Sequence, residues 1–137
     1  MVTGNSFDAD YDQRHSVRVY ASYRVKPTVN LSGRWIWASG LPVRGYFARA
    51  GPEDIVLSAE RNRLRLPEYQ RADFRINKAF IRNWGQLTLF AEVINLTNRE
   101  NIRFDDIRSY DTRTGAARLS CDTMFPILPS VGLVVDF

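Results

Sequence analysis

Residues 129–137 read Pro129-Ser130-Val131-Gly132-Leu133-Val134-Val135-Asp136-Phe137, and this stretch decides the fold. In an extended strand, successive side chains point to opposite faces. One face of this stretch therefore carries four apolar residues: Val131, Leu133, Val135 and Phe137. The ends of soluble domains usually fray and carry polar residues. An apolar stripe that runs to a final aromatic residue is instead typical of the closing strand of a bacterial outer-membrane β-barrel.

The same alternation of apolar and polar residues recurs in earlier segments. It covers residues 15–25, 29–37, 69–82 and 86–95. Lys26-Pro27 separates the first pair of segments, and Asn83-Trp84-Gly85 separates the second pair; both read as tight turns. The sequence therefore predicts an all-β, antiparallel up-and-down fold of about five strands.

The connections between these strands alternate between short and long. Residues 39–68 and 96–125 are the long ones, and the second contains a predicted turn at 111–115. Within the first, residues 54–65 fit either a short helix or a loop hairpin. Outer-membrane barrels have short periplasmic turns and long extracellular loops. Placing Phe137 at the periplasmic end puts both short turns on that side and both long segments outside.

Aromatic residues fall near the two ends of the predicted strands, as membrane interfaces favour. The outer group is Trp35, Trp37 and Tyr69, and the inner group is Tyr23, Phe80, Trp84 and Phe137. The alternative is a soluble, lipocalin-like β-barrel or sandwich whose core these residues would fill, around an apolar ligand in the lipocalin-like case. Alternation by itself does not say which face is inside, but the loop asymmetry and the terminal Phe137 favour the membrane interpretation.

Composition excludes several other classes. The chain has 137 residues with 45% hydrophobic residues and a net charge of +4, and it has no apolar run long enough for a transmembrane helix. Residues 1–6 lack the features of a signal peptide. The arginines are spread along the strands instead of clustering, which disfavours nucleic-acid binding. With one cysteine, Cys121, and one histidine, His15, we expect no disulfide framework, metal site, catalytic residue or cofactor. An outer-membrane barrel enzyme is disfavoured for the same reason.

Five motifs, in order along nearly the whole chain, carry a family resemblance. They are DQRHS at 12–16, SGLP at 39–42, LPEYQRADFRINK at 66–78, VINLTNREN at 93–101 and LPSVGLVVDF at 128–137. This combination resembles the late barrel strands of TonB-dependent outer-membrane receptors. The resemblance implies uptake of a scarce nutrient, such as an iron-siderophore, across the outer membrane of a Gram-negative bacterium. Because a barrel needs about eight strands to close, five strands predict that residues 1–137 are a C-terminal receptor segment without a plug domain, unable to transport alone.

The resemblance and the strand pattern together give three groups of candidate functional residues. The predicted lumen-facing charged row is Arg18, Arg24, Arg34, Asp73, Arg75 and Glu92. Possible ligand contacts in the long loops are Arg44, Tyr46, Phe47, Arg49, Phe104 and Tyr110. The predicted barrel-assembly signal is Phe137 with Val135, Leu133 and Val131. Expected partners are outer-membrane lipid, the barrel-assembly machinery and an unidentified small molecule, with the TonB complex engaged only through the absent N-terminal part.

Overall fold

The computed structural model describes residues 7–50 and 54–137, apart from the side chains of Asp105, Asp106 and Tyr110. The described residues form antiparallel β-sheets and include no helix. They therefore contain no helical segment that could cross a membrane. The chain divides into two compact units. Unit 1 contains the chain up to Ser16, Ala38–Tyr69 and Asn101–Met124; unit 2 contains Val17–Trp37, Gln70–Glu100 and Phe125–Phe137. The all-β prediction is confirmed.

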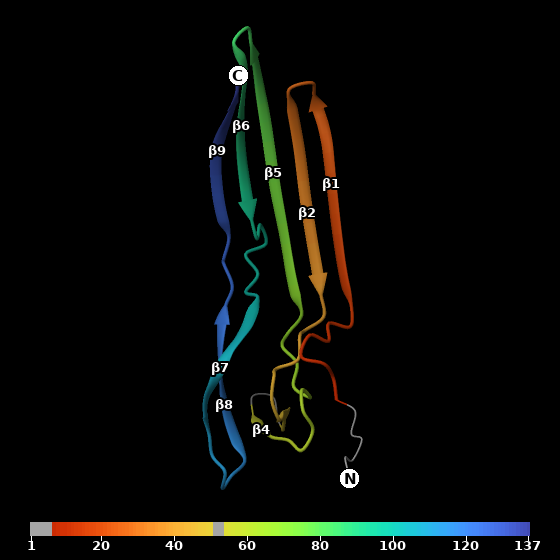
Figure 1. Ribbon diagram of the computed structural model, residues 1–137, viewed down its shortest axis with the longest axis vertical. Helices are drawn as coiled ribbons and strands as arrows, with labels where there is room; N and C mark the ends of the chain where they lie inside the picture. The colour runs from red at the N-terminus through yellow and green to blue at the C-terminus, as the bar shows by residue number, and fades with distance from the viewer. Residues whose placement is uncertain (1–6, 51–53) are drawn as a thin grey trace. The chain divides into compact units, whose positions relative to one another are not determined.

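Unit 2 is built on a five-stranded sheet with the strand order β1-β2-β5-β6-β9. The strands are β1 (Ser16–Lys26), β2 (Val29–Ala38), β5 (Tyr69–Arg82), β6 (Gly85–Ile94) and β9 (Leu128–Asp136). Neighbouring strands run in opposite directions (Figure 1). The structure thus confirms the five strands predicted from alternation, each to within about a residue, and it leaves β1 and β9 as the sheet edges.

Both predicted tight turns are present in unit 2. Residues 27–28 join β1 to β2, and residues 83–84 join β5 to β6. Gly85 follows the second turn with φ +148°, and a Cβ there would lie 2.1 Å from the carbonyl oxygen of Asp136. Only glycine allows this close approach, which lets β9 pair with β6 to the end of the strand, where Gln86 faces Asp136.

Unit 1 contains a second sheet that the sequence did not predict. Its order is β3-β4-β8-β7, and its strands are β3 (Phe47–Arg49), β4 (Ile55–Leu57), β7 (Ile102–Tyr110) and β8 (Ala116–Thr123). Both long segments therefore contain strands instead of being irregular. The pairing of β7 with β8 shifts register twice, between Phe104 and Asp106 and between Ile107 and Ser109. Such bulges interrupt the two-residue period, so alternation could not identify β7.

Two expectations for the long segments concern residues of unit 1: a short helix or loop hairpin at 54–65, and a turn at 111–115. Residues 54–65 form neither a helix nor a hairpin of their own. Their one strand, β4, pairs antiparallel with β3, which lies before this range. At the turn, the Asp111 N–H donates to the Ala116 carbonyl at 2.8 Å, and the Gly115 N–H donates to the Asp111 carbonyl at 2.8 Å. The turn prediction is confirmed, and it joins β7 to β8.

The two units differ in where hydrophobic residues are buried. Unit 1 has a core of Val43, Phe47, Leu64 and Ala117, packed against Ile55, Leu66, Phe104 and Leu119. Ala38, the last residue of β2, is also buried and is grouped with unit 1. In unit 2 the buried residues are polar, Asp73 and Asn95. The five-stranded sheet therefore has no hydrophobic core of its own within the described residues.

Candidate functional site

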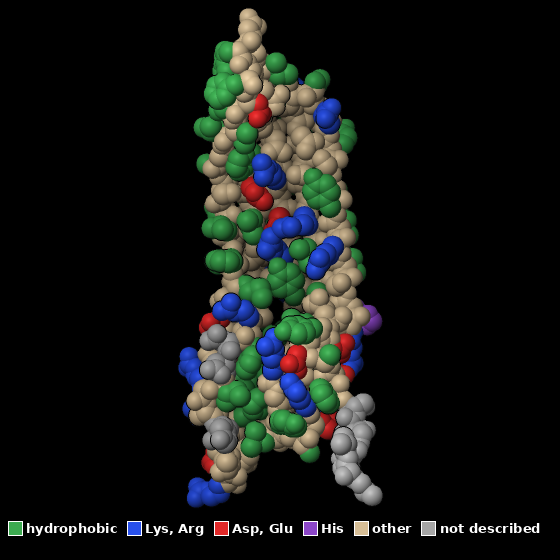
Figure 2. Space-filling model, in the orientation of Figure 1, with side chains coloured by type: hydrophobic (Ala, Val, Ile, Leu, Met, Phe, Trp, Pro, Cys, Tyr) green, Lys and Arg blue, Asp and Glu red, His purple; other side chains and the backbone are tan. Residues whose placement is uncertain are grey.

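The two faces of the five-stranded sheet have opposite chemistry. The register places Ile76, Ala91 and Val131 side by side, and it places Arg75, Glu92 and Ser130 in the next row on the other face. On the apolar face, Leu133 is 63% and Val131 83% exposed. Figure 2 shows charged side chains gathered along the polar face, with hydrophobic side chains at its margins. One face is thus a mainly apolar exposed surface, on which Lys78 lies opposite Leu89, and the other face is an ordered polar one.

Asp73 is the centre of the polar face. Its carboxylate is buried and accepts hydrogen bonds from Arg34 Nη2 at 2.6 Å and Arg71 Nη2 at 2.8 Å. The backbone N–H of Asn95 donates to it as well, at 3.0 Å. These bonds connect β2, β5 and the end of β6 through one side chain. Each is a hydrogen bond to a charged group, the stronger class in proteins.

Asn95 directly follows β6, and its backbone conformation lets its N–H donate to Asp73. It is buried with φ +54°, and its Nδ2 donates to the carbonyls of Arg99 at 3.0 Å and Phe125 at 3.1 Å. Asparagine tolerates this left-handed backbone better than most residues. The sequence analysis assigned a site role to neither Arg71 nor Asn95. The signal for Arg71 was present, since residues 71, 73 and 75 alternate onto one face.

Arg75 organises the next part of the polar face. Its Nη1 lies 3.7 Å from Glu92 Oε2, and its Nε donates to Asn77 Oδ1 at 2.9 Å. The guanidinium also lies over the Phe90 ring, 4.1 Å from the ring centroid. Phe90 in turn covers Gly132 on β9, where a Cβ would lie 2.5 Å from the ring. An aromatic side chain over a strand glycine fills the space left by the missing side chain.

Replacing Gly132 with alanine is expected to destabilise the sheet by about 1–2 kcal/mol, within the range for overpacking. The added methyl group would push the Phe90 ring away, and that ring is a movable side chain rather than backbone. Urea unfolding of the full chain measures the effect. Gly132→Ala combined with Phe90→Ala should recover part of the loss; a double variant as unstable as the sum of the two single variants would contradict this contact.

Four of the six residues of the predicted charged row form pairs. They are Arg34 with Asp73 and Arg75 with Glu92. Arg18 and Arg24 lie in β1, all of whose residues are exposed. The structure therefore brings together the part of the row on β2, β5 and β6.

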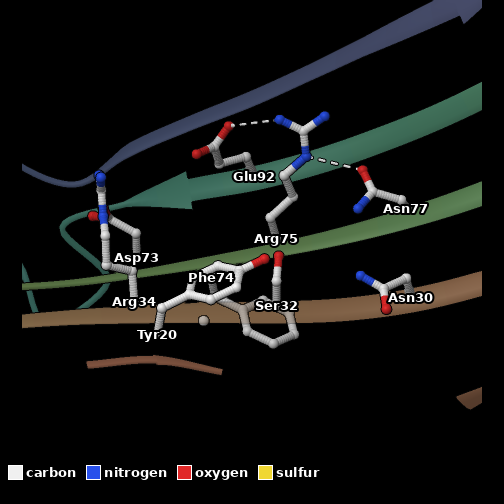
Figure 3. A pocket seen from close by; sticks show the side chains of 10 residues that line it. Tyr20, Asn30, Ser32, Arg34, Asp73, Phe74, Arg75, Asn77 and Glu92 are labelled. Atoms are coloured by element: carbon white, nitrogen blue, oxygen red, sulfur yellow. Dashed lines mark hydrogen bonds and ion pairs between the residues drawn. The ribbon is translucent and has the colours of Figure 1, made fainter. Parts of the chain in front are cut away.

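An open hollow of about 400 Å³ lies on the same polar face (Figure 3). Its lining includes Tyr20, Asn30, Ser32, Arg34, Asn77 and Glu92. In Figure 3 the Arg75–Glu92 ion pair and the Arg75–Asn77 hydrogen bond border one side of it. Hydroxyl, amide and charged groups of both signs make this a surface for polar contacts.

The predicted assembly signal lies at the end of the apolar face. Leu133 faces Leu89, and Val135 faces Leu87 across β6. Phe137 is 99% exposed, and its ring centroid lies 6.2 Å from that of Trp84. These two aromatic rings extend the apolar face next to the turn at 83–84.

The predicted ligand-loop residues have different environments in unit 1. Phe47 belongs to the core and Phe104 packs against it, so burial directs both rings away from an external ligand. Tyr46 and Arg49 are exposed, and Arg44 lies over the Tyr11 ring at 5.1 Å. The side chain of Tyr110 lies outside the described residues.

An ionic cluster in unit 1 was not found by the sequence analysis. Arg61 Nη2 donates to both carboxylate oxygens of Asp10, at 3.0 and 3.1 Å. Arg65 donates to the carboxylates of Asp8, at 2.7 Å, and Asp12. The partners are more than 50 positions apart, which local pattern reading does not connect.

Asp12 is held in its charged form in this cluster. The hydrogen bond from Arg65, with a further one from Arg14, holds the pKa of Asp12 below its ordinary value of 3.8. Because the folded-state pKa is the lower one, the stabilisation is complete above pH 3.8 and is lost as the pH falls through the folded-state value.

We expect an NMR titration of the Asp12 carboxyl carbon to have its midpoint below 3.8 in the full chain. Arg65→Ala should move the midpoint upward, because the largest cause of the shift is removed. Equal midpoints in the two proteins would show that Arg65 does not set this titration.

The described residues contain no cluster of three or more His, Cys, Asp or Glu side chains placed to hold a metal ion. His15 contributes a backbone contact, its N–H donating to Ser39 Oγ at 3.1 Å, and Cys121 is an exposed free thiol in β8. In comparisons with known proteins, no family model, no curated protein and no solved structure matches this sequence.

Proposed function

We propose that the five-stranded sheet is part of the wall of an outer-membrane β-barrel of the TonB-dependent receptor type, in a Gram-negative bacterium. Its apolar face would contact lipid and its polar face would face the barrel interior. The observation that carries this proposal is a sheet with one exposed apolar face and no hydrophobic core of its own in the described residues.

The apolar face argues for a lipid environment on energetic grounds. Burying apolar surface is favourable by about 25 cal/mol per Å². Soluble monomers rarely expose contiguous apolar patches larger than a few hundred Å². Here exposed hydrophobic side chains occur on neighbouring strands of one face, among them Phe74, Ile76, Leu89, Val131 and Leu133. Lipid chains would cover this surface without a second protein layer.

The polar face argues for the barrel interior. A charged side chain facing lipid is costly, so intramembrane charges lie toward the protein interior or water and pair with one another. Asp73 with Arg34 and Arg71, and Arg75 with Glu92, follow this rule. In this position the charged row would form a mutually paired lumen wall.

In the proposed receptor, the sheet serves uptake of a scarce nutrient, for example an iron-siderophore, and it cannot transport alone because five strands do not close a barrel. Phe137 with Val131, Leu133 and Val135 would be recognised by the barrel-assembly machinery. The TonB complex would be engaged by other parts of the receptor. Tyr46, Arg44 and Arg49 would lie on the outer side, where a ligand arrives.

The test uses the full chain in vesicles containing lipids brominated on the acyl chain. Trp35 lies in β2 in the apolar row and is 43% exposed, so a variant that keeps it as the single tryptophan (Trp37→Phe, Trp84→Phe) should be strongly quenched. Absence of quenching, together with a chain that is soluble and monomeric without detergent, would overturn the proposal and favour a soluble lipocalin-like protein.

A further inference from the structure

The residues just before β1 make specific side-chain contacts with other residues of unit 1. The acidic segment, residues 7–12, reads Phe7-Asp8-Ala9-Asp10-Tyr11-Asp12 and lies outside any strand. Besides the neighbouring Arg14, which pairs with Asp8 and Asp12, four residues of unit 1 contact the segment. We call these four the arginine platform: Arg44, Arg61, Asn62 and Arg65. The contacts involve three carboxylates, two aromatic rings and two backbone carbonyls of the segment.

Arginines make the charged and aromatic contacts. Arg61 binds the Asp10 carboxylate through two hydrogen bonds and lies over the Phe7 ring, 5.3 Å from its centroid. Arg44 lies over the Tyr11 ring in the same way. Arginine suits both tasks, because its planar guanidinium binds carboxylates and stacks on aromatic faces.

Asn62 connects the acidic segment to the loop at Gly45. It is completely buried with φ +61°, and its Oδ1 accepts from the Gly45 N–H at 3.2 Å. Its Nδ2 donates to the Asp8 carbonyl at 2.8 Å and to Asp10 Oδ1 at 2.7 Å. Both polar ends of the side chain are thus used, and one end is fixed to the loop that carries it. A buried amide with all contacts made holds the platform in one geometry.

We propose that the arginine platform is a binding surface for an acidic peptide containing aromatic residues, and that the chain's own residues 7–12 occupy it as a detachable ligand. When this segment is released, the platform presents three arginines that an acidic partner segment can bind. The proposal is independent of the function proposed above, since all of its contacts lie within unit 1.

The chemistry of the contacts makes the segment detachable. Arg61 and Asp10 keep 39% and 28% of their side chains exposed, so water and salt reach their ion pair. Individual exposed pairs contribute little, about 0–1 kcal/mol. Their effect is screened by salt, since the Debye length falls from about 10 Å at 0.1 M to about 3 Å at 1 M. Each ion pair is therefore weak by itself, and the two hydrogen bonds from the buried Asn62 to Asp8 and Asp10 are the contacts that water reaches least.

The first test is hydrogen–deuterium exchange of the full chain, in whichever buffer or detergent keeps it monomeric. Arg61→Ala should increase the opening of residues 7–14 about five- to thirtyfold, the factor that corresponds to 1–2 kcal/mol. Arg63→Ala is the matched control, because Arg63 pairs with its neighbour Glu60 and not with the acidic segment. Raising the salt to 1 M should act in the same direction as Arg61→Ala. Equal exchange in the two variants would overturn the proposal.

The second test asks whether the platform binds a peptide supplied from outside. A labelled peptide with the sequence of residues 7–12 is added to the full chain and to the variant Asp8→Asn, Asp10→Asn, Asp12→Asn. The variant should bind at least about tenfold more tightly, because its own segment competes less. Unchanged exchange of β8, which lies in unit 1 with the platform, shows that this part of the variant is folded. Equal binding to both chains, or a dimer whose formation requires Arg61, would exclude the segment as an internal ligand.

Discussion

Replacing Leu133 with arginine is expected to destabilise the protein in lipid by about 2–4 kcal/mol, the cost measured for a basic residue on the lipid face near the middle of a membrane barrel. Leu133 lies in the middle of β9, faces Leu89 on β6 and is 63% exposed on the apolar face. In the proposed location, the guanidinium would be forced into hydrocarbon. Denaturant unfolding of the full chain in vesicles measures the loss.

Val134→Arg is the matched control. Val134 is the next residue, lies on the polar face opposite Thr88 and is also exposed. Its replacement should change the unfolding free energy by less than about 0.5 kcal/mol, as for ordinary surface substitutions. If Leu133→Arg were as mild as Val134→Arg, the apolar face would not be in contact with lipid.

Asp73→Ala should be the most damaging change on the polar face, at about 3 kcal/mol, the lower end of the range for breaking a buried ion pair. The lower end applies because Arg34 keeps 48% of its side chain exposed and can be partly solvated after the loss. The substitution removes the common acceptor of Arg34, Arg71 and the Asn95 N–H. Urea unfolding of the full chain measures the effect.

Glu92→Ala provides the comparison on the same face. Glu92 forms an ion pair with Arg75 at 3.7 Å, too long for a strong hydrogen bond, and both side chains are partly exposed. Its loss should cost less than about 1 kcal/mol. Two equal losses would mean that Asp73 is one pair among several and not the centre of the polar face.

The strands of unit 2 could be predicted because their information is local. Side chains alternate with a period of two residues, so residues 69–82 indicate both a strand and its two faces without reference to the rest of the chain. The turns at 27–28 and 83–84 carry proline and glycine signals in the same way. In unit 1 the turn at 111–115 was predicted but the strands were not. For β7 the reason is that bulges shift its register and break the alternation.

The candidate sites also divide into those that local sequence patterns could predict and those that depend on contacts between distant residues. The charged row on β2, β5 and β6 was predicted because its members alternate onto one face, whereas Phe47 was assigned to a ligand loop and is in fact part of a core. Of the arginine platform, Arg44 was among the predicted ligand contacts, whereas Arg61, Asn62 and Arg65 were missed. The contacts of these three residues with residues 7–12 join positions more than 50 residues apart.

The sequence by itself determined the strands of unit 2, their turns and the side chains on each face, since these depend on neighbours along the chain. The tertiary structure alone decided which residues are buried, because burial depends on what packs against a residue from elsewhere. It showed that the stripe of Val131, Leu133 and Val135 covers no core. It also showed that one carboxylate, Asp73, gathers two arginines from adjacent strands.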